Sequence, residues 1–320
     1  MQNGSGVPRR SMLGGALAGA AAGIGLTGTA SAAERGTAAR GGSSRAVIQP
    51  RHRTVDGLSI RYADSGPADK GGREALLLCP WPESLFAFDQ MWPHLARNTR
   101  LIAIDLPGFG HSERRETLLS PKAMGDFVIK IADAFGLKNP HAVGPDIGTG
   151  ALLFAAAAHP GRLRSVVIGS GGAAFPIQLG TVLRDWVFTP DITPYRGIGR
   201  QVVSGALDTI ENHTLPADIR EDYLSAYEDD KFVESMAYVR SYHTNLPALG
   251  ELRPDIKTPV QIIAGRHDTA VPPANAEYLH KHLPHSRLDY LNVGHFTWEE
   301  DATGYASLVT DWWNGGYTKA

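Results

Sequence analysis

The sequence has little cysteine, little net charge and few recognisable ligand-binding motifs. The chain of 320 residues has one cysteine, Cys79, so an internal disulfide cannot form. The formal net charge of −2 gives no reason to expect nucleic acid or another polyanion as a partner. No internal repeat, metal-ligand spacing or phosphate-binding glycine loop is apparent, and no cofactor is predicted. An apolar content of 42% and a charged content of 20% are ordinary for a soluble globular protein.

The N-terminal segment differs from the rest of the chain and has the pattern of an export signal. Arg9-Arg10 precedes a mildly apolar run, rich in glycine and alanine, that contains no acidic residue and ends at Thr29. Ala30-Ser31-Ala32 then fits the small-residue motif of a cleavage site. These features predict a twin-arginine signal peptide over residues 1–32, export to the periplasm or the extracellular space, and no stable membrane insertion after cleavage. The alternative is an uncleaved membrane anchor, because the run is about 20 residues long.

The rest of the chain alternates between short apolar strands and helical segments. Residues 33–48, rich in Ala, Gly, Ser and Arg, are expected to be a disordered lead-in. A hairpin is expected over residues 53–62 with its turn at Asp56-Gly57, and a helix over residues 121–136. The other expected strands are residues 76–79, 101–104, 140–143, 166–169, 260–264 and 287–291. Strands that alternate with helices predict an α/β fold with a doubly wound, mostly parallel sheet.

The segment Gly144-Pro145-Asp146-Ile147-Gly148 has the pattern of a nucleophile elbow. It lies between an apolar strand and an alanine-rich helical stretch, with small residues on either side of a central nucleophile. Glycine supplies the backbone freedom of a strained turn and leaves room for the helix that follows. The central residue is usually serine, whereas here it is Asp146. A carboxylate is ionised at neutral pH and can attack a saturated carbon to form an alkyl ester.

Two further polar residues follow later strands in the order that this chemistry requires. Asp268 and His295 each come just past the carboxyl end of a predicted strand. Open α/β sheets form their sites at that edge, so Asp146, Asp268 and His295 are expected to meet there. Taken singly, Asp268 could cap a helix that starts near Pro272, and His295 could be an ordinary loop histidine. The order nucleophile, acid and histidine favours a catalytic set.

From about residue 50 to its end, the chain resembles an α/β-hydrolase of the epoxide hydrolase and haloalkane dehalogenase branch. Four motifs carry this resemblance. They are the elbow with Asp146, the segment Asp105-Leu106-Pro107-Gly108-Phe109-Gly110-His111-Ser112, the segment Gly265-Arg266-His267-Asp268, and Gly294-His295-Phe296 followed by Glu299 and Glu300. The resemblance implies no cofactor, and it implies a small apolar to amphipathic substrate as the partner.

The resemblance also implies a domain organisation. Between Gly171 and about Pro254 the alternation stops, no clear strand is present, and helical patterns appear at residues 218–229 and 231–242. This is where the family inserts a helical cap, which excludes water and shapes the substrate pocket. A hydrolase core is therefore expected over residues 49–171 and 255–320, with the cap over residues 172–254.

The segment Leu78-Cys79-Pro80-Trp81-Pro82-Glu83-Ser84 resembles the His-Gly-Trp-Pro-Glu-Ser stretch of epoxide hydrolases, with two differences. Cys79 replaces the histidine and Pro80 replaces the glycine, and proline has no N–H group. The resemblance implies that the backbone N–H groups of Trp81 and Ile147 form the oxyanion hole used when water attacks the ester. Cys79 ends an apolar strand and is expected to be a buried thiol rather than a nucleophile.

In epoxide hydrolases, tyrosines of the cap donate a proton to the epoxide oxygen while the aspartate attacks carbon. The stretch Ala237-Tyr238-Val239-Arg240 resembles the family motif, but Val239 stands where the donor tyrosine is expected. Tyr238 and Tyr242 are therefore the possible ring-opening donors. Packing within a helix is the alternative for each of them.

The sequence thus predicts an exported hydrolase in which Asp146 attacks, His295 activates water, Asp268 orients His295, and epoxides are the favoured substrates. A haloalkane dehalogenase is an alternative, and Trp81 and Trp186 could supply indole N–H donors to a halide. That group usually has Trp beside the nucleophile, however, and the fluoroacetate enzymes have Arg, where this chain has Ile147. An ester or lactone hydrolase is another alternative. A non-catalytic small-molecule binding protein on a hydrolase scaffold is a different class. Pro80 and Val239, which depart from the family pattern, favour a binding protein. The intact set of Asp146, Asp268 and His295 is evidence against it. The oligomeric state is not predicted.

We expect the mature protein to begin near Ala33, because Ala30-Ser31-Ala32 fits a cleavage site. N-terminal sequencing of the secreted protein measures this position. A native product that begins at Met1 and is found only in the cytosol would rule out the predicted signal peptide.

Overall fold

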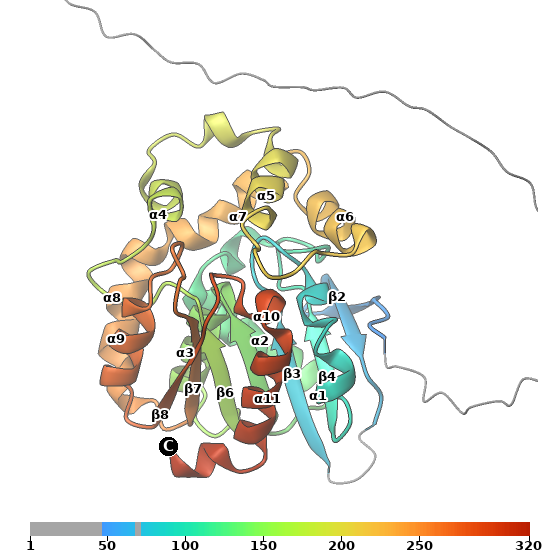
Figure 1. Cartoon of the computed structure of the whole chain (residues 1–320), viewed down its shortest axis with the longest axis vertical. Coiled ribbons are helices and arrows are strands. Elements are labelled where there is room, and N and C mark those ends of the chain that lie inside the picture. Colours follow the sequence, from blue (N-terminus) through green and yellow to red (C-terminus); the bar gives the residue numbers. More distant parts are fainter. Residues whose placement is uncertain (1–46, 68–71) are drawn as a thin grey trace, which may run out of the picture. The chain divides into compact units, whose positions relative to one another are not determined.

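The computed structural model describes residues 47–67 and 72–320 (Figure 1). The predicted signal peptide and nearly all of the predicted lead-in lie outside the described residues. Within the described ranges, no helix is long and apolar enough to span a bilayer.

A single sheet in the described part of the chain contains eight strands in the order β1-β2-β4-β3-β5-β6-β7-β8. β2 pairs antiparallel with β1 and β4, and the other neighbouring strands are parallel. The strands are β1 (Arg51–Val55), β2 (Leu58–Asp64), β3 (Arg73–Leu78), β4 (Thr99–Ile104), β5 (His141–Pro145), β6 (Ser165–Gly169), β7 (Val260–Gly265) and β8 (Ser286–Leu291). The expected hairpin at Asp56-Gly57 is formed by β1 and β2.

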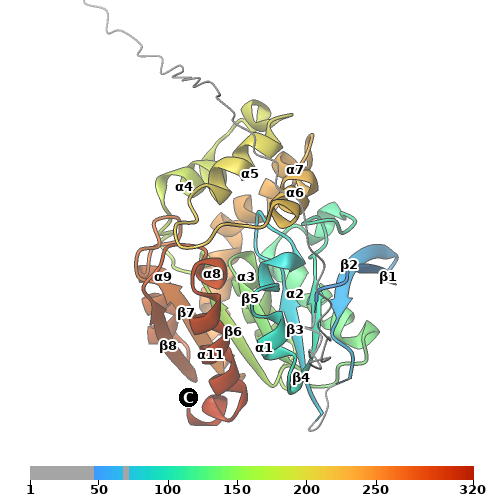
Figure 2. The same cartoon turned by 45° about the vertical axis from the view of Figure 1, so that its right-hand side comes forward.

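Helices cover both faces of the sheet (Figure 1 and Figure 2). The helices of the core are α1 (Trp92–Leu95), α2 (Pro121–Ala134), α3 (Ile147–Ala158), α9 (Ala274–His282), α10 (Thr297–Glu300) and α11 (Ala302–Trp313). In β3, Leu76 and Leu78 belong to the apolar cluster that contains α2 and α3, whereas Leu77 belongs to the cluster that contains α1 and α11. Successive side chains of a strand point to opposite faces, so a strand covered on both sides is apolar at nearly every position.

The segment between β6 and β7 is helical and lies over the end of the sheet where the parallel strands finish (Figure 1 and Figure 2). We call this segment the cap. Its helices are α4 (Thr181–Phe188), α5 (Gly199–Leu207), α6 (Ala217–Ala226), α7 (Lys231–Arg240) and α8 (Tyr242–Leu252). The expected helical pattern over residues 231–242 is divided at Ser241, where α7 ends. The expected fold class, a doubly wound, mostly parallel sheet with an inserted helical cap, is confirmed.

A partly buried ion cluster attaches α6 of the cap to the core. Arg61 on β2 donates to the two carboxylate oxygens of Asp222 at 3.0 and 2.6 Å, and to Asp105 at 3.3 Å. Burial raises the pKa of Asp222, but hydrogen bonds from His111, Arg61 and Ser84 outweigh it and lower this pKa to about 2. Ionised Asp222 therefore stabilises the fold above its ordinary pKa of 3.8, and this contribution is lost as the pH falls through about 2.

Candidate active site

Asp146 lies between β5 and α3, and its backbone is strained. Its φ and ψ angles are 52° and −119°, a region that residues other than glycine rarely adopt. A Cβ atom on Gly144 would lie 2.8 Å from a side chain of α3, and one on Gly171 would lie 2.3 Å from the carbonyl oxygen of Asp146. A Cβ atom on Gly148 would lie 3.5 Å from Leu78, which is ordinary contact. A side chain at Gly144 would therefore press on Leu152 and on the backbone of Gly148, whereas Gly148 itself has room for a side chain.

The two backbone N–H groups predicted to form the oxyanion hole bind the carboxylate of Asp146. The N–H of Trp81 donates to Oδ2 at 2.8 Å, and the N–H of Ile147 also hydrogen-bonds to this carboxylate. Pro80 has no N–H, but the donor comes from the next residue, so the loop still reaches the nucleophile. Cys79 is fully buried, and its sulfur accepts a backbone N–H at 3.2 Å.

The structure brings His295 and Asp268 to the same place. His295 Nδ1 lies 2.9 Å from Asp268 Oδ2, and His295 Nε2 lies 3.9 Å from Asp146 Oδ1. The other oxygen of Asp268 accepts the N–H groups of Ala270 and Val271 at 2.9 and 2.7 Å. Asp268 therefore caps a turn before α9 rather than the helix itself, and its second oxygen faces the imidazole.

Asp146 and His295 form a charged pair at neutral pH. Burial raises the pKa of Asp146 to about 6, and the charge of His295 and the two N–H donors compensate only in part. Burial lowers the pKa of His295, but the charge and hydrogen bond of Asp268 and the charge of Asp146 outweigh it and raise this pKa to about 9. Between about pH 6 and about pH 9, the resting site therefore contains a carboxylate and an imidazolium.

Tyr238 and Tyr242, the two candidate ring-opening donors, lie on α7 and α8 with their ring centroids 6.2 Å apart. The hydroxyl of Tyr238 donates to the carbonyl oxygen of Ile147 at 2.7 Å. The hydroxyl of Tyr242 has no hydrogen-bond partner among residues 47–67 and 72–320. Burial, and then the charge of Asp146, raise the pKa of Tyr242 well above its ordinary value, so the phenol is neutral. The hydroxyl proton of Tyr242 is thus available within range of the Asp146 charge.

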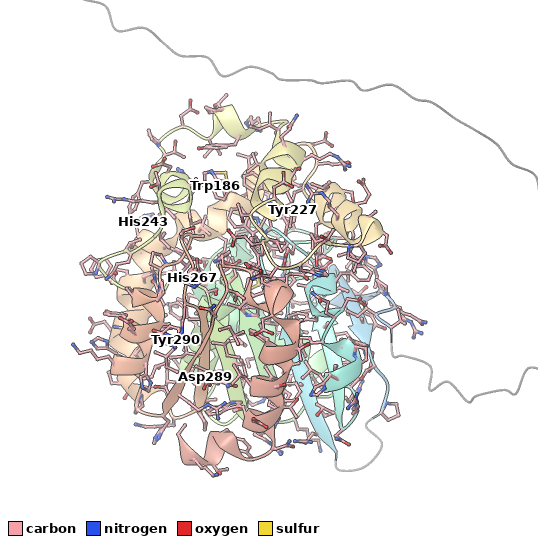
Figure 3. The ribbon with its side chains drawn as sticks, in the orientation of Figure 1. Trp186, Tyr227, His243, His267, Asp289 and Tyr290 are labelled. Atoms are coloured by element: carbon pink, nitrogen blue, oxygen red, sulfur yellow. The ribbon has the colours of Figure 1, made fainter. Side chains whose placement is uncertain are left out.

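Aromatic side chains of the cap contact the ring of Trp81. Phe232 on α7 is stacked on it at 5.2 Å between centroids, and Trp186 on α4, labelled in Figure 3, meets it edge-on at 5.4 Å. The indole N–H of Trp81 donates to Ser235 on α7 at 2.9 Å. No motif in the sequence predicted a role for Ser235. Its hydrogen bond directs the indole N–H of Trp81 toward the cap.

The arrangement brings together the carboxylate of Asp146, two backbone N–H donors and the Asp268–His295 pair, from separate loops, at one edge of the sheet. This set can form and hydrolyse a covalent ester. The described ranges contain no group of three or more histidine, cysteine, aspartate or glutamate side chains that could hold a metal ion.

The chain is similar to known hydrolases. A family model described as alpha/beta hydrolase fold matches residues 74–196. The chain is 30% identical over 226 residues to 2-hydroxymuconate semialdehyde hydrolase from Pseudomonas putida, and the match covers 67% of this chain and 76% of that protein.

Two solved structures of similar proteins have the same fold. One is a meta-cleavage product hydrolase (CumD) from Pseudomonas fluorescens IP01, with a TM-score of 0.67, 22% identity, and coverage of 84% of this chain and 98% of that one. The other is the epoxide hydrolase CorEH, with a TM-score of 0.67, 18% identity, and coverage of 82% and 98%. At these identities the likeness concerns the fold alone.

We expect Asp146→Asn to lower the pKa of His295, because it removes a negative charge that stabilises the imidazolium. NMR titration of the imidazole resonances in the wild-type protein and the variant measures the change. Asp289→Asn is the control, since Asp289 is paired with Arg287 on β8, away from the cap (Figure 3). An unchanged His295 pKa in the Asp146 variant would mean that the two side chains are not coupled in solution.

Proposed function

Because the chain belongs to the α/β-hydrolase superfamily, we propose that it hydrolyses small apolar to amphipathic epoxides to diols through a covalent ester of Asp146. The observation that carries the proposal is the carboxylate at the elbow. Asp146 accepts the N–H of Trp81 at 2.8 Å and lies 3.9 Å from Nε2 of His295. A serine at this position would need a base to become a nucleophile, whereas Asp146 is ionised above about pH 6.

In the first half-reaction, one oxygen of the Asp146 carboxylate attacks a ring carbon of the epoxide. The bond between that carbon and the ring oxygen breaks, and Tyr242 gives its proton to the departing oxygen. The products are an alkyl ester of Asp146, a hydroxyl group on the substrate and a phenolate. Alkylation removes a charge that raised the pKa of His295, so the imidazolium then returns a proton to the phenolate through solvent.

In the second half-reaction, neutral His295 takes a proton from water while the water oxygen attacks the ester carbonyl carbon. The N–H groups of Trp81 and Ile147 donate to the oxyanion that forms. The intermediate collapses, the bond from the carbonyl carbon to the alkyl oxygen breaks, and that oxygen takes the hydroxyl proton of the intermediate. The diol leaves, and Asp146 and His295 are again a carboxylate and an imidazolium.

Other uses of the site have less support. A leaving halide needs N–H donors near the attacked carbon, but the indole N–H of Trp81 donates to Ser235, and Ile147 adds no side-chain donor. An activated ester or lactone could use the same nucleophile without needing a proton from Tyr242. A binding protein without catalysis would have no use for an aspartate whose backbone strain costs about 1–3 kcal/mol.

His295→Gln is expected to complete the first half-reaction and to stop at the ester. Asp146 attacks without a base, whereas water must lose a proton as it attacks the ester. Intact-protein mass spectrometry after incubation with an epoxide should show a mass increase equal to that of the substrate, and peptide mapping should place it on Asp146. Asp146→Asn is the control and should form no adduct.

Wild-type enzyme in a single turnover in heavy-oxygen water should carry the label in the Asp146 carboxylate rather than in the diol. Label in the diol, together with no adduct in the His295 variant, would make Asp146 a base for water and overturn the mechanism.

To test the substrate class, diol formation and halide release are compared on epoxides and haloalkanes with the same carbon skeleton. Faster halide release would make haloalkanes the better substrates.

Tyr242→Phe should lower kcat/KM for epoxides by about 100-fold or more, because the departing alkoxide loses its proton donor. Tyr238→Phe should have a smaller effect, since the proton of Tyr238 is donated to the carbonyl oxygen of Ile147. An activated aryl ester serves as the second substrate, because its leaving group needs no proton. Equal losses on both substrates in the Tyr242 variant would indicate a packing role instead.

A further inference from the structure

Glu83 lies two residues after Trp81 on the loop of residues 79–84, which we call the oxyanion loop, and is completely buried. Its Oε2 accepts the indole N–H of Trp298 on α10 at 2.7 Å, while Oε1 has no partner among the described residues. Its backbone carbonyl accepts the hydroxyl of Tyr227, which follows α6 in the cap, at 2.9 Å (Figure 3). This one residue of the oxyanion loop therefore contacts both the cap and the helix that follows His295.

Trp298 connects Glu83 to the imidazole of His295. It is fully buried, and its ring meets the imidazole edge-on with centroids 5.9 Å apart. It also meets Phe296 edge-on at 5.7 Å. A buried indole N–H is costly without an acceptor, and Glu83 supplies that acceptor. The orientation of the ring beside His295 therefore depends on the Glu83 side chain.

The charge state of Glu83 follows from its neighbours. Burial raises its pKa well above the ordinary value, the charges of Glu299 and Asp146 raise it further, and the single hydrogen bond from Trp298 opposes them. Glu83 is in no ion pair within the described part of the chain. A neutral carboxyl group has nearly the shape of an amide, so glutamine can replace it with little disturbance.

Glu299 lies next to Glu83 in the same buried region. It accepts the hydroxyl of Tyr223 from α6 at 2.9 Å and the amide of Gln90 at 2.9 Å. Burial raises its pKa to about 7, those hydrogen bonds oppose the rise, and the charge of Asp89 adds to it. His213 of the cap, 3.9 Å away, is the nearby basic group, and burial lowers its pKa. Among residues 47–67 and 72–320, no Lys or Arg side chain forms an ion pair with Glu83 or Glu299, which favours the neutral form of Glu83.

We propose that Glu83 is a positioning residue for the hydrolytic half-reaction: its carboxyl group holds Trp298, and so keeps His295 and the N–H of Trp81 in fixed places around the ester of Asp146. This inference rests on the proposed function of the site. Ester hydrolysis requires water to be aligned with His295 and with the oxyanion donors at the same time. The first half-reaction does not use His295 as a base, and therefore depends less on Glu83.

Glu83→Ala and Glu83→Gln in the full-length protein test the proposal. Glu83→Ala should lower kcat by about 10- to 100-fold with a smaller change in KM, and the Asp146 ester should accumulate during turnover. Glu83→Gln keeps an acceptor for Trp298 and should retain most of the wild-type kcat. Trp298→Phe keeps an aromatic ring but removes the N–H, so this variant should also accumulate the ester. It replaces Glu83→Ala in the test if the alanine variant does not fold.

A second measurement needs no substrate. The NMR resonances of the His295 ring sense the Trp298 ring, so they should move in Glu83→Ala and stay near their wild-type positions in Glu83→Gln. If these shifts appear but the wild-type protein opens no epoxide, the proposed function fails and the positioning role stands. Three results would overturn the positioning role. They are unmoved His295 resonances in Glu83→Ala, equal slowing of both half-reactions, and equal losses of kcat in Glu83→Gln and Glu83→Ala.

Discussion

The site depends on one buried negative charge, the carboxylate of Asp146. Its burial raises the pKa to about 6, and the N–H groups of Trp81 and Ile147 and the charge of His295 keep it ionised at neutral pH. The same charge helps to raise the pKa of His295 to about 9. Alkylation of the carboxylate would remove this charge and lower the pKa of His295, while the charge and the hydrogen bond of Asp268 would still raise it.

The cap is joined to the site by polar contacts as well as by apolar packing. Arg61 and Asp222 attach α6 to β2, and Tyr227 donates to the carbonyl of Glu83 on the oxyanion loop. Tyr223 donates to Glu299, one residue after Trp298. These hydrogen bonds connect the position of α6 to the positions of Glu83 and of the segment that follows His295.

The relatives share the fold, and the chemistry depends on side chains placed upon it. In this chain the elbow residue is Asp146, and the hydroxyl of Tyr242 near it has no partner within the described ranges. Ser235 takes the indole N–H of Trp81, which removes a donor that a halide could have used. The last two details favour epoxide opening over dehalogenation, whereas the aspartate suits both reactions. Export by the twin-arginine route stays a prediction, since residues 1–32 lie outside the described part of the chain.

The sequence by itself determined the fold class, because apolar strands and helices repeat along the chain with periods that short-range geometry dictates. It also indicated Asp146, Asp268 and His295, since each follows a strand and parallel strands end at one edge. It left Tyr238 and Tyr242 equivalent and assigned no role to Ser235 or to the Glu83 side chain. Only the tertiary structure distinguished these residues, because hydrogen-bond partners and burial arise from segments that are far apart in the sequence.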